Sequence, residues 1–241
     1  MAFRIRLLLD FLAVSLIIAC LAYWWLDNLS HELLGTTLFV LVIAHNVFNR
    51  RWYESVPRGR HDLARVVNIV TITALASTML VLLVTSLLIS RDLFSVMALD
   101  GAFAVREIHM FAAYWVLLII AIHLGTRWTV VMNVCRTLFG LRQPNLARTM
   151  ALRCVALVFA AWGVKASFDM AFGTKLMLTY SLDMWDFSES SLGFFVNYSS
   201  IVGLYAAATH YALTAARHRQ RALTFRRFSP TLDHLLWCFP A

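Results

Sequence analysis

Residues 31–45 read HELLGTTLFVLVIAH, and residues 109–123 read HMFAAYWVLLIIAIH. Each stretch is an apolar run with a histidine at both ends, and the two histidines are separated by the same interval in both runs. In an α-helix, fourteen steps return to within about 40° of the starting direction and advance about 21 Å. Each run therefore predicts a helix that presents two histidines on one face, one near each boundary of a membrane.

The composition of the whole chain indicates that these helices lie in a lipid bilayer. Of its 241 residues, 61% are hydrophobic and 14% are charged, and the mean hydropathy is +0.71. A water-soluble domain of this size cannot hide so much apolar surface in its core. The apolar runs are continuous rather than alternating, which favours helices over a barrel, because backbone groups in lipid must pair within their own segment. We expect an all-α integral membrane helical bundle of six transmembrane helices, near residues 7–26, 32–49, 66–89, 108–133, 151–171 and 195–215.

The positive charges predict the orientation of the bundle. If the N-terminus is cytoplasmic, only four of the 21 Lys and Arg residues fall on the outer side, namely Arg91, Arg106, Lys165 and Lys175. This bias predicts that both termini are cytoplasmic, and it explains the net charge of +8 without nucleic-acid binding. We expect a membrane domain over residues 1–216 and a basic cytoplasmic tail over 217–241 that contacts membrane lipid, in a multi-pass protein of the bacterial inner membrane.

The two histidine pairs predict a cofactor. In this topology the second and fourth helices run in the same direction, so His31 faces His109 near the outer surface and His45 faces His123 near the inner one. Two facing pairs of imidazoles in a helical bundle are what two bis-histidine haems require. The four cysteines are isolated and no CxxCH motif is present, so the expected cofactors are two noncovalent haem b groups with these four histidines as metal ligands.

Two other functions stay open at this point. A histidine in a membrane helix can simply bond a neighbouring helix, and a histidine pathway can carry ions or protons without any cofactor. A haem-free, histidine-lined ion transporter predicts acidic residues at mid-membrane, and none lies midway in the second, third or fourth segment. The remaining alternative is a haem-containing membrane anchor that serves a separate oxidoreductase.

Small and cationic residues close to the histidines are further candidates for the cofactor environment. Gly35 and Gly125 remove side-chain bulk where a flat macrocycle approaches the backbone, although close helix packing explains them equally well. Haem propionates need cationic partners at the membrane surface. Arg91 and Arg106 border the outer histidine pair, and Arg127 borders the inner pair.

A group of polar residues near the cytoplasmic boundary predicts a site for quinone. His210 lies about two turns from the inner end of the sixth segment, at roughly the depth of His45. Asp10 and Asn49 fall at a similar depth. Together they are candidates for a quinol-oxidising site, while structural hydrogen bonding and haem ligation are the other interpretations of His210.

The chain resembles the flavinylation-associated cytochrome family, formerly a domain of unknown function, which is similar in architecture to bacterial cytochrome b membrane proteins. The segments that carry the resemblance are HELLGTTLFVLVIAHNVFNRRWY (31–53), LISRDLFSV (88–96) and REIHMFAAYWVLLIIAIHLGTRW (106–128), with GLYAAATHY (203–211) as a weaker match. The resemblance implies a haem-carrying bundle that moves electrons across the membrane to an extracytoplasmic protein bearing covalently bound flavin. The family's ligand positions match His31, His45, His109 and His123. Asn46 and Arg127 depart from the family, whose members often carry histidine there.

An acidic and aromatic outer segment, SLDMWDFSESS at 181–191, has two interpretations. Trp185 and Phe187 favour an amphipathic segment that lies at the membrane interface. Its carboxylates favour a docking surface for an extracytoplasmic flavin or haem protein, because acidic rims steer transient partners. The three carboxylates are those of Asp183, Asp186 and Glu189.

Overall fold

The structure is a computed structural model that describes residues 2–55, 63–141, 143, 145–178 and 185–228. Over these ranges the chain is helical and contains no β-strand, which confirms the all-α class. The elements are α1 (Ala2–Leu21), α2 (Asn28–Phe48), α3 (Arg50–Ser55), α4 (Leu63–Ile89), the 3₁₀ helix η2 (Ser95–Met97), α5 (Phe103–Leu138), α6 (Leu146–Asp169), α7 (Phe172–Lys175) and α8 (Ser191–Phe228).

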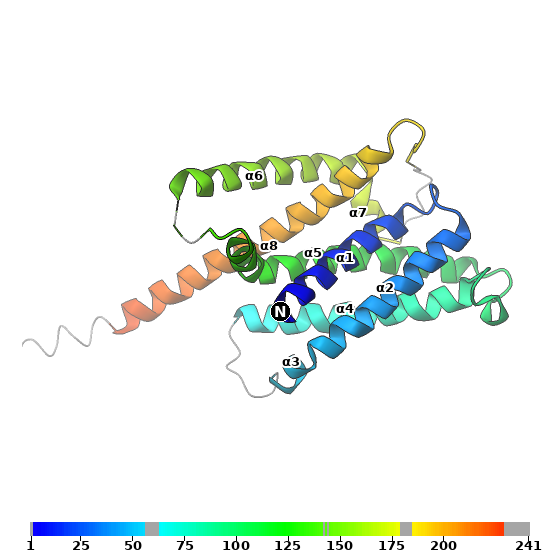
Figure 1. Cartoon of the computed structure of the whole chain (residues 1–241), viewed down its shortest axis with the longest axis horizontal. Helices are drawn as coiled ribbons and strands as arrows, with labels where there is room; N and C mark the ends of the chain where they lie inside the picture. The colour runs from blue at the N-terminus through cyan, green and yellow to red at the C-terminus, as the bar shows by residue number, and fades with distance from the viewer. Residues whose placement is uncertain (1, 56–62, 142, 144, 179–184, 229–241) are drawn as a thin grey trace, which may run out of the picture.

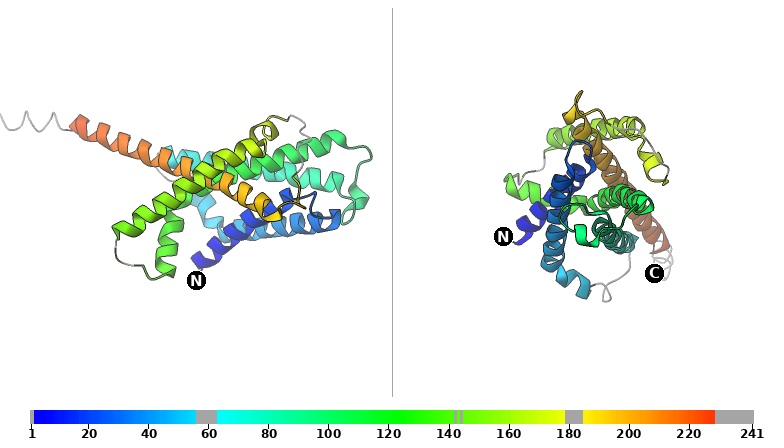
Figure 2. Two further views of the ribbon diagram at one scale, coloured as in Figure 1. Left: turned by 90° about the horizontal axis from the view of Figure 1, so that it is seen from above. Right: turned by 90° about the vertical axis from the view of Figure 1, so that its right-hand side faces the viewer.

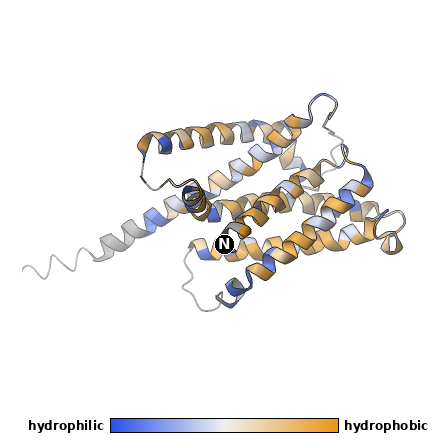
Figure 3. Ribbon diagram, in the orientation of Figure 1, coloured by the Kyte–Doolittle hydropathy of each residue, from blue (hydrophilic) through white to orange (hydrophobic). Residues whose placement is uncertain are grey.

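Each of the six predicted apolar segments lies in a separate helix. Among the described residues, five helices are long and apolar enough to cross a membrane, namely α2, α4, α5, α6 and α8. The apolar part of α1, Leu7–Leu21, is shorter. Apolar residues dominate the middles of these helices, and the polar ones gather toward their ends (Figure 3). The chain is therefore a multi-pass membrane protein, and the sixth crossing by α1 stays a prediction.

Helix α5 lies at the centre of the bundle. It packs against α4 on one side and α8 on the other, with α1 also in contact, while α6 packs on α8 (Figures 1 and 2). Helix α2 packs mainly on α1. The α1–α2 turn and η2 lie at one end of the bundle, and α3 and the α5–α6 turn lie at the other (Figure 1). Helices α2 and α5 thus run in the same direction, as the paired histidine intervals predict.

Local sequence signals account for where these helices begin and end. Asp27 caps the N-terminus of α2, because its carboxylate accepts the Ser30 N–H at 2.6 Å, and this bond lowers the pKa of Asp27. Asn145 caps α6 in the same way through the N–H of Arg148. Helix α5 ends at Leu138, and two residues later Gly140 has a φ of 64°, in the left-handed region that favours glycine after a helix.

The structure describes the surroundings of one predicted boundary and of two charges in the fifth predicted segment. Helix α8 runs without a break to Phe228, so residue 216, the predicted end of the membrane domain, lies inside a helix. Lys165 and Asp169 stand in the apolar part of α6, where they form an i,i+4 ion pair. Such a pair lowers the cost of placing two charges near lipid, which is why this segment continues as a helix despite them.

Candidate functional site

The outer histidine pair is assembled as predicted. The ring centroids of His31 on α2 and His109 on α5 lie 6.3 Å apart, with an angle of 70° between the ring planes. A bond between a metal ion and an imidazole nitrogen is about 2.0–2.1 Å long. Because that nitrogen lies roughly 1.1 Å from the ring centre, two imidazoles on opposite sides of one ion have centroids about 6.3 Å apart. The separation of these two rings therefore fits a bis-histidine site.

A hydrogen bond sets the tautomer of His109. Its Nδ1 atom lies 3.0 Å from the hydroxyl of Thr85 on α4. That hydroxyl already donates to the Val81 carbonyl at 2.7 Å, within its own helix, so it accepts the Nδ1–H of His109. The lone pair of His109 is then on Nε2, the nitrogen that remains for a metal. A bond of this kind is the usual outer partner of a metal-bound histidine.

His31 is held by an aromatic neighbour. Its ring meets that of Tyr23 edge-on, with centroids 5.0 Å apart and an interplanar angle of 87°. The Nδ1 atom of His31 is buried and has no hydrogen-bond partner among the described residues. An unpaired buried nitrogen is unfavourable, and a polar ligand in the adjacent space would compensate for it.

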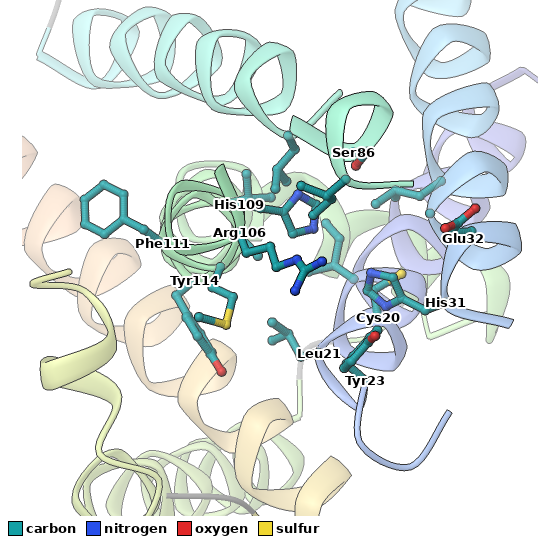
Figure 4. Close-up of a pocket in the computed structure, with 18 of the residues that line it drawn as sticks. Cys20, Leu21, Tyr23, His31, Glu32, Ser86, Arg106, His109, Phe111 and Tyr114 are labelled. Carbon is teal, nitrogen blue, oxygen red and sulfur yellow. The ribbon is translucent and has the colours of Figure 1, made fainter. Parts of the chain in front are cut away.

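The two histidines line a cavity of about 780 Å³ between α1, α2, α4, α5 and the start of α8. Arg106 extends its guanidinium into the space between His109 and His31 (Figure 4). Gly35 also lines the cavity, and nothing lies within 4 Å of where its Cβ would be. Arg91 lines the mouth. These three residues give the cavity open space beside Gly35 and two cations, which are the features that a flat anionic ligand would need.

The two histidines can be compared with the ligand sets that hold a bare metal ion. Among the residues that the structure describes, no group of three or more His, Cys, Asp or Glu side chains is arranged to hold one. Two histidines alone leave most coordination positions of an ion open. In a haem the macrocycle supplies the four equatorial nitrogens, so two axial histidines complete the site.

The inner pair is arranged differently. The Nδ1 of His45 lies 2.7 Å from the Asp10 carboxylate, and its Nε2 lies 3.1 Å from the side-chain nitrogen of Asn49. The Nδ1 of His123 is buried without a hydrogen-bond partner, and this residue interacts electrostatically with Asp10, His45 and Arg127. His45 and His123 make no ring contact in the described part of the chain. The inner residues are neighbours, but their rings do not lie in contact as those of the outer pair do, whose planes meet at 70°.

Three other predicted positions have contacts that define their surroundings. A Cβ on Gly125 would lie 2.5 Å from the Ala206 carbonyl oxygen, so this glycine lets α8 approach α5 closely. The described contacts of His210 are with Tyr211, Thr214 and Arg217 on its own helix, and they do not include Asp10 or Asn49. Asn46, a departure from the family pattern, accepts a hydrogen bond from the Tyr53 hydroxyl.

Two polar residues of the outer site were missed in the sequence reasoning. Thr85 orients His109, and no sequence pattern distinguishes it from the other threonines of α4. Glu32 follows His31 directly, and its carboxylate bonds the segment after α4 through Ser90 and neighbouring N–H groups. Glu32 could have been identified from the sequence as a residue of the site. Acidic residues are rare in membrane helices and usually have a structural or functional role there.

The described part of the acidic outer segment, residues 185–190, has aromatic residues inside and acids outside. Trp185 and Phe187 line the cavity, and Phe187 stacks on Trp25 with centroids 5.9 Å apart. Asp186 and Glu189 are exposed. The two aromatic side chains thus pack against the protein, which weakens their interpretation as lipid anchors. Asp183 lies outside the described residues.

Comparisons of the chain with family models, with curated proteins and with solved structures found no match.

Proposed function

We propose that this protein is a b-type membrane cytochrome that carries electrons across the bacterial inner membrane. The observation that supports this most directly is the outer pair, His31 and His109, with centroids 6.3 Å apart beside a cavity of about 780 Å³. The Thr85 bond, which leaves Nε2 of His109 free, adds to that support. A haem b, when bound, supplies a one-electron carrier.

The residues of the outer site have separate roles in this proposal. His31 and His109 would hold the haem iron. Arg106, with Arg91 at the mouth, neutralises the propionates, and the aromatic wall of Tyr23 and its neighbours keeps water away from the ring.

The proposal includes a second haem b between His45 and His123. Asp10 accepts from Nδ1 of His45, which leaves the lone pair on Nε2, the arrangement that suits a ligand. Asn49 now bonds that nitrogen, so binding requires Asn49 to move aside. Arg127, which interacts electrostatically with His123, would be the cation for a propionate at this site.

The route of electrons follows from the positions of the two sites. Electrons enter from the quinone pool on the cytoplasmic side, near Asp10 and Asn49, with His210 as a further candidate at that depth. They pass from the inner site to the outer one, and leave to an extracytoplasmic protein that carries flavin or haem. Both termini are cytoplasmic and α1 is the sixth crossing in this arrangement.

The test is the visible spectrum of the purified protein. We expect a low-spin b-type band in the reduced-minus-oxidised spectrum and two haems per chain. His31→Ala and His109→Ala each remove the outer haem, and His210→Ala, the matched control, retains both. A chain without a haem band contradicts the proposal and leaves the histidine-lined transporter. Quinol oxidation by the purified protein alone separates a cytochrome that oxidises quinol from an anchor subunit.

A further inference from the structure

The carboxylate of Glu32 is surrounded by donors from a different part of the chain. Glu32 stands in the first turns of α2, next to His31. Its two oxygens accept the Ser90 hydroxyl at 2.8 Å and the backbone N–H groups of Arg91 and Leu93 at 2.7 and 2.8 Å. The Asn28 side chain donates to it at 2.8 Å as well. We name Asn28, Glu32, Ser90 and the backbone of 91–93 the Glu32 network.

This network is built into the fold rather than added at its surface. Ser90 is only 3% exposed, and its hydroxyl also accepts the N–H of Phe94. Asn28 donates to Asp92 at 2.7 Å and contacts the Tyr23 hydroxyl, the same tyrosine that packs on His31. Successive N–H groups turned toward one anion form a strong and directional site, and here the anion is a side chain of the protein itself.

The position of α2 makes this link important. Helix α2 packs mainly on α1, and its N-terminal end, which carries His31, lines the cavity and meets α5 through the contact between His31 and His109. The Glu32 network connects that end of α2 to the segment that follows α4. The last turns of α4 also carry Thr85, which holds His109. The last turns of α4 and the segment after it therefore contact the surroundings of both histidines. Thr85 bonds His109 directly, and the segment after α4 bonds Glu32, the neighbour of His31 in the sequence.

We infer that Glu32 is a positioning residue that sets the spacing and angle of His31 relative to His109. This inference rests on the proposed haem site, but it concerns the protein's own geometry and can be tested without the cofactor. The simpler alternative is that Glu32 only orders the connection after α4. That alternative predicts no change in the relation between the two histidines when Glu32 is replaced.

The first experiment measures the distance between α2 and α5 in protein prepared without haem. Spin labels on Leu33 and Ile108, which are exposed near the two histidines, report that distance in a background without other reactive cysteines. We expect Glu32→Ala to broaden the distance distribution. Asp100→Asn is the matched control, because Asp100 is an exposed acid in the same connection, and it leaves the distribution unchanged.

The second experiment uses haem-loaded protein and the electron paramagnetic resonance spectrum of its oxidised form, which reports the angle between the axial imidazoles. We expect Glu32→Ala to shift the signal of the outer haem and to release that haem about tenfold faster or more, as replacing outer-shell partners of ligands does. Glu32→Gln keeps one accepting oxygen but sets an NH2 group against two of the donors and removes the charge, so we expect a smaller shift of the signal than in Glu32→Ala together with a higher midpoint potential.

The outcomes are distinguishable. An unchanged distance distribution in Glu32→Ala overturns the inference, whatever the haem content. A broadened distribution in a protein that takes up no haem contradicts the proposed function and supports the positioning role. If Glu32→Ala does not fold, Ser90→Ala and Asn28→Ala each remove one donor. Their distributions must then broaden, and a native distribution in both refutes the inference.

Discussion

In His109 and His45, a single hydrogen bond decides which ring nitrogen carries the lone pair. Thr85 accepts from Nδ1 of His109, and Asp10 accepts from Nδ1 of His45, so Nε2 carries the lone pair in both rings. A metal needs that lone pair, and an outer partner on the other nitrogen fixes the ring and raises its basicity. The two acceptors lie on different helices from the histidines they hold. Helix packing is therefore what prepares these rings for ligation.

Replacing Thr85 by Val tests this role at the outer site. Valine keeps the shape of threonine but cannot accept the Nδ1–H, so we expect the outer haem to be held 10- to 100-fold more weakly. The measurement is the haem retained per chain after dilution. Thr78→Val is the matched control, because the Thr78 hydroxyl bonds only carbonyls of its own helix, and it retains full haem content. Equal retention in both variants contradicts the assigned role of Thr85.

At the scale of elements, small residues determine how closely α8 packs on its neighbours. Gly125 on α5 faces the Ala206 carbonyl, and Gly163 on α6 faces the Ser200 carbonyl. Helices in lipid gain little from burying apolar surface, so close backbone approach and dispersion contacts supply much of their association energy. Helix α8 is thereby held between α5 and α6, and it completes the wall of the cavity through Phe194 and Tyr198.

Gly125→Ala tests this contact. The added Cβ would lie 2.5 Å from the Ala206 oxygen, so α5 and α8 must separate, and we expect a loss of about 1–3 kcal/mol of stability. Thermal unfolding in detergent measures the loss. Gly173→Ala is the control, because nothing lies within 4 Å of where its Cβ would be and the residue does not line the cavity, so its unfolding temperature stays near the native value. A native unfolding temperature for Gly125→Ala shows that the two helices adjust without cost.

At the scale of the whole molecule, the helices alternate in direction, so the connections gather at two ends. The α1–α2 turn, η2 and α7 lie at the end with the outer histidine pair (Figure 1). The opposite end holds α3, the α5–α6 turn and most of the arginines. The proposed transfer of electrons between opposite faces of a membrane would use these two ends.

The orientation can be tested with reporters. A reporter that is active only in the cytoplasm, fused after Ala241 or inserted at Gly140, should be active. The same reporter at Gly101 should be silent, because the positive-inside bias puts the α4–α5 connection outside. Activity at Gly101 would mean that the bundle has the opposite orientation. A silent fusion at Ala241 together with an active one at Gly140 would show an odd number of crossings.

The exposed carboxylates of Asp186 and Glu189 at the outer end are the proposed docking surface for an electron-transfer partner. The Ser188 hydroxyl and N–H donate to Asp186 and lower the pKa of that carboxyl. Asp186 therefore stays charged at pH values below those at which a carboxyl group ordinarily becomes protonated. We expect Asp186→Asn with Glu189→Gln to slow oxidation of the prereduced protein by its external partner at low ionic strength, with native haem spectra. Glu54→Gln on α3, at the opposite end, is the control. An unchanged rate excludes this segment as the docking surface.

The fold class and the location of the outer histidine pair were predictable from the sequence. Apolar runs of about twenty residues have few structural options in lipid, and helical periodicity places His31 and His45, or His109 and His123, on one face. The parallel direction of α2 and α5 followed from counting segments. These inferences need only local periodicity and the solvent.

The tertiary structure alone decided what surrounds each histidine. Thr85 is 24 residues from His109, and Ser90 is 58 residues from Glu32, so no local pattern links them. The same interval of histidines yields facing rings at the outer end and a ring bonded to Asp10 and Asn49 at the inner end. Spacing along a helix fixes depth and face, whereas the contacts of a ring depend on the neighbouring helices that packing brings beside it.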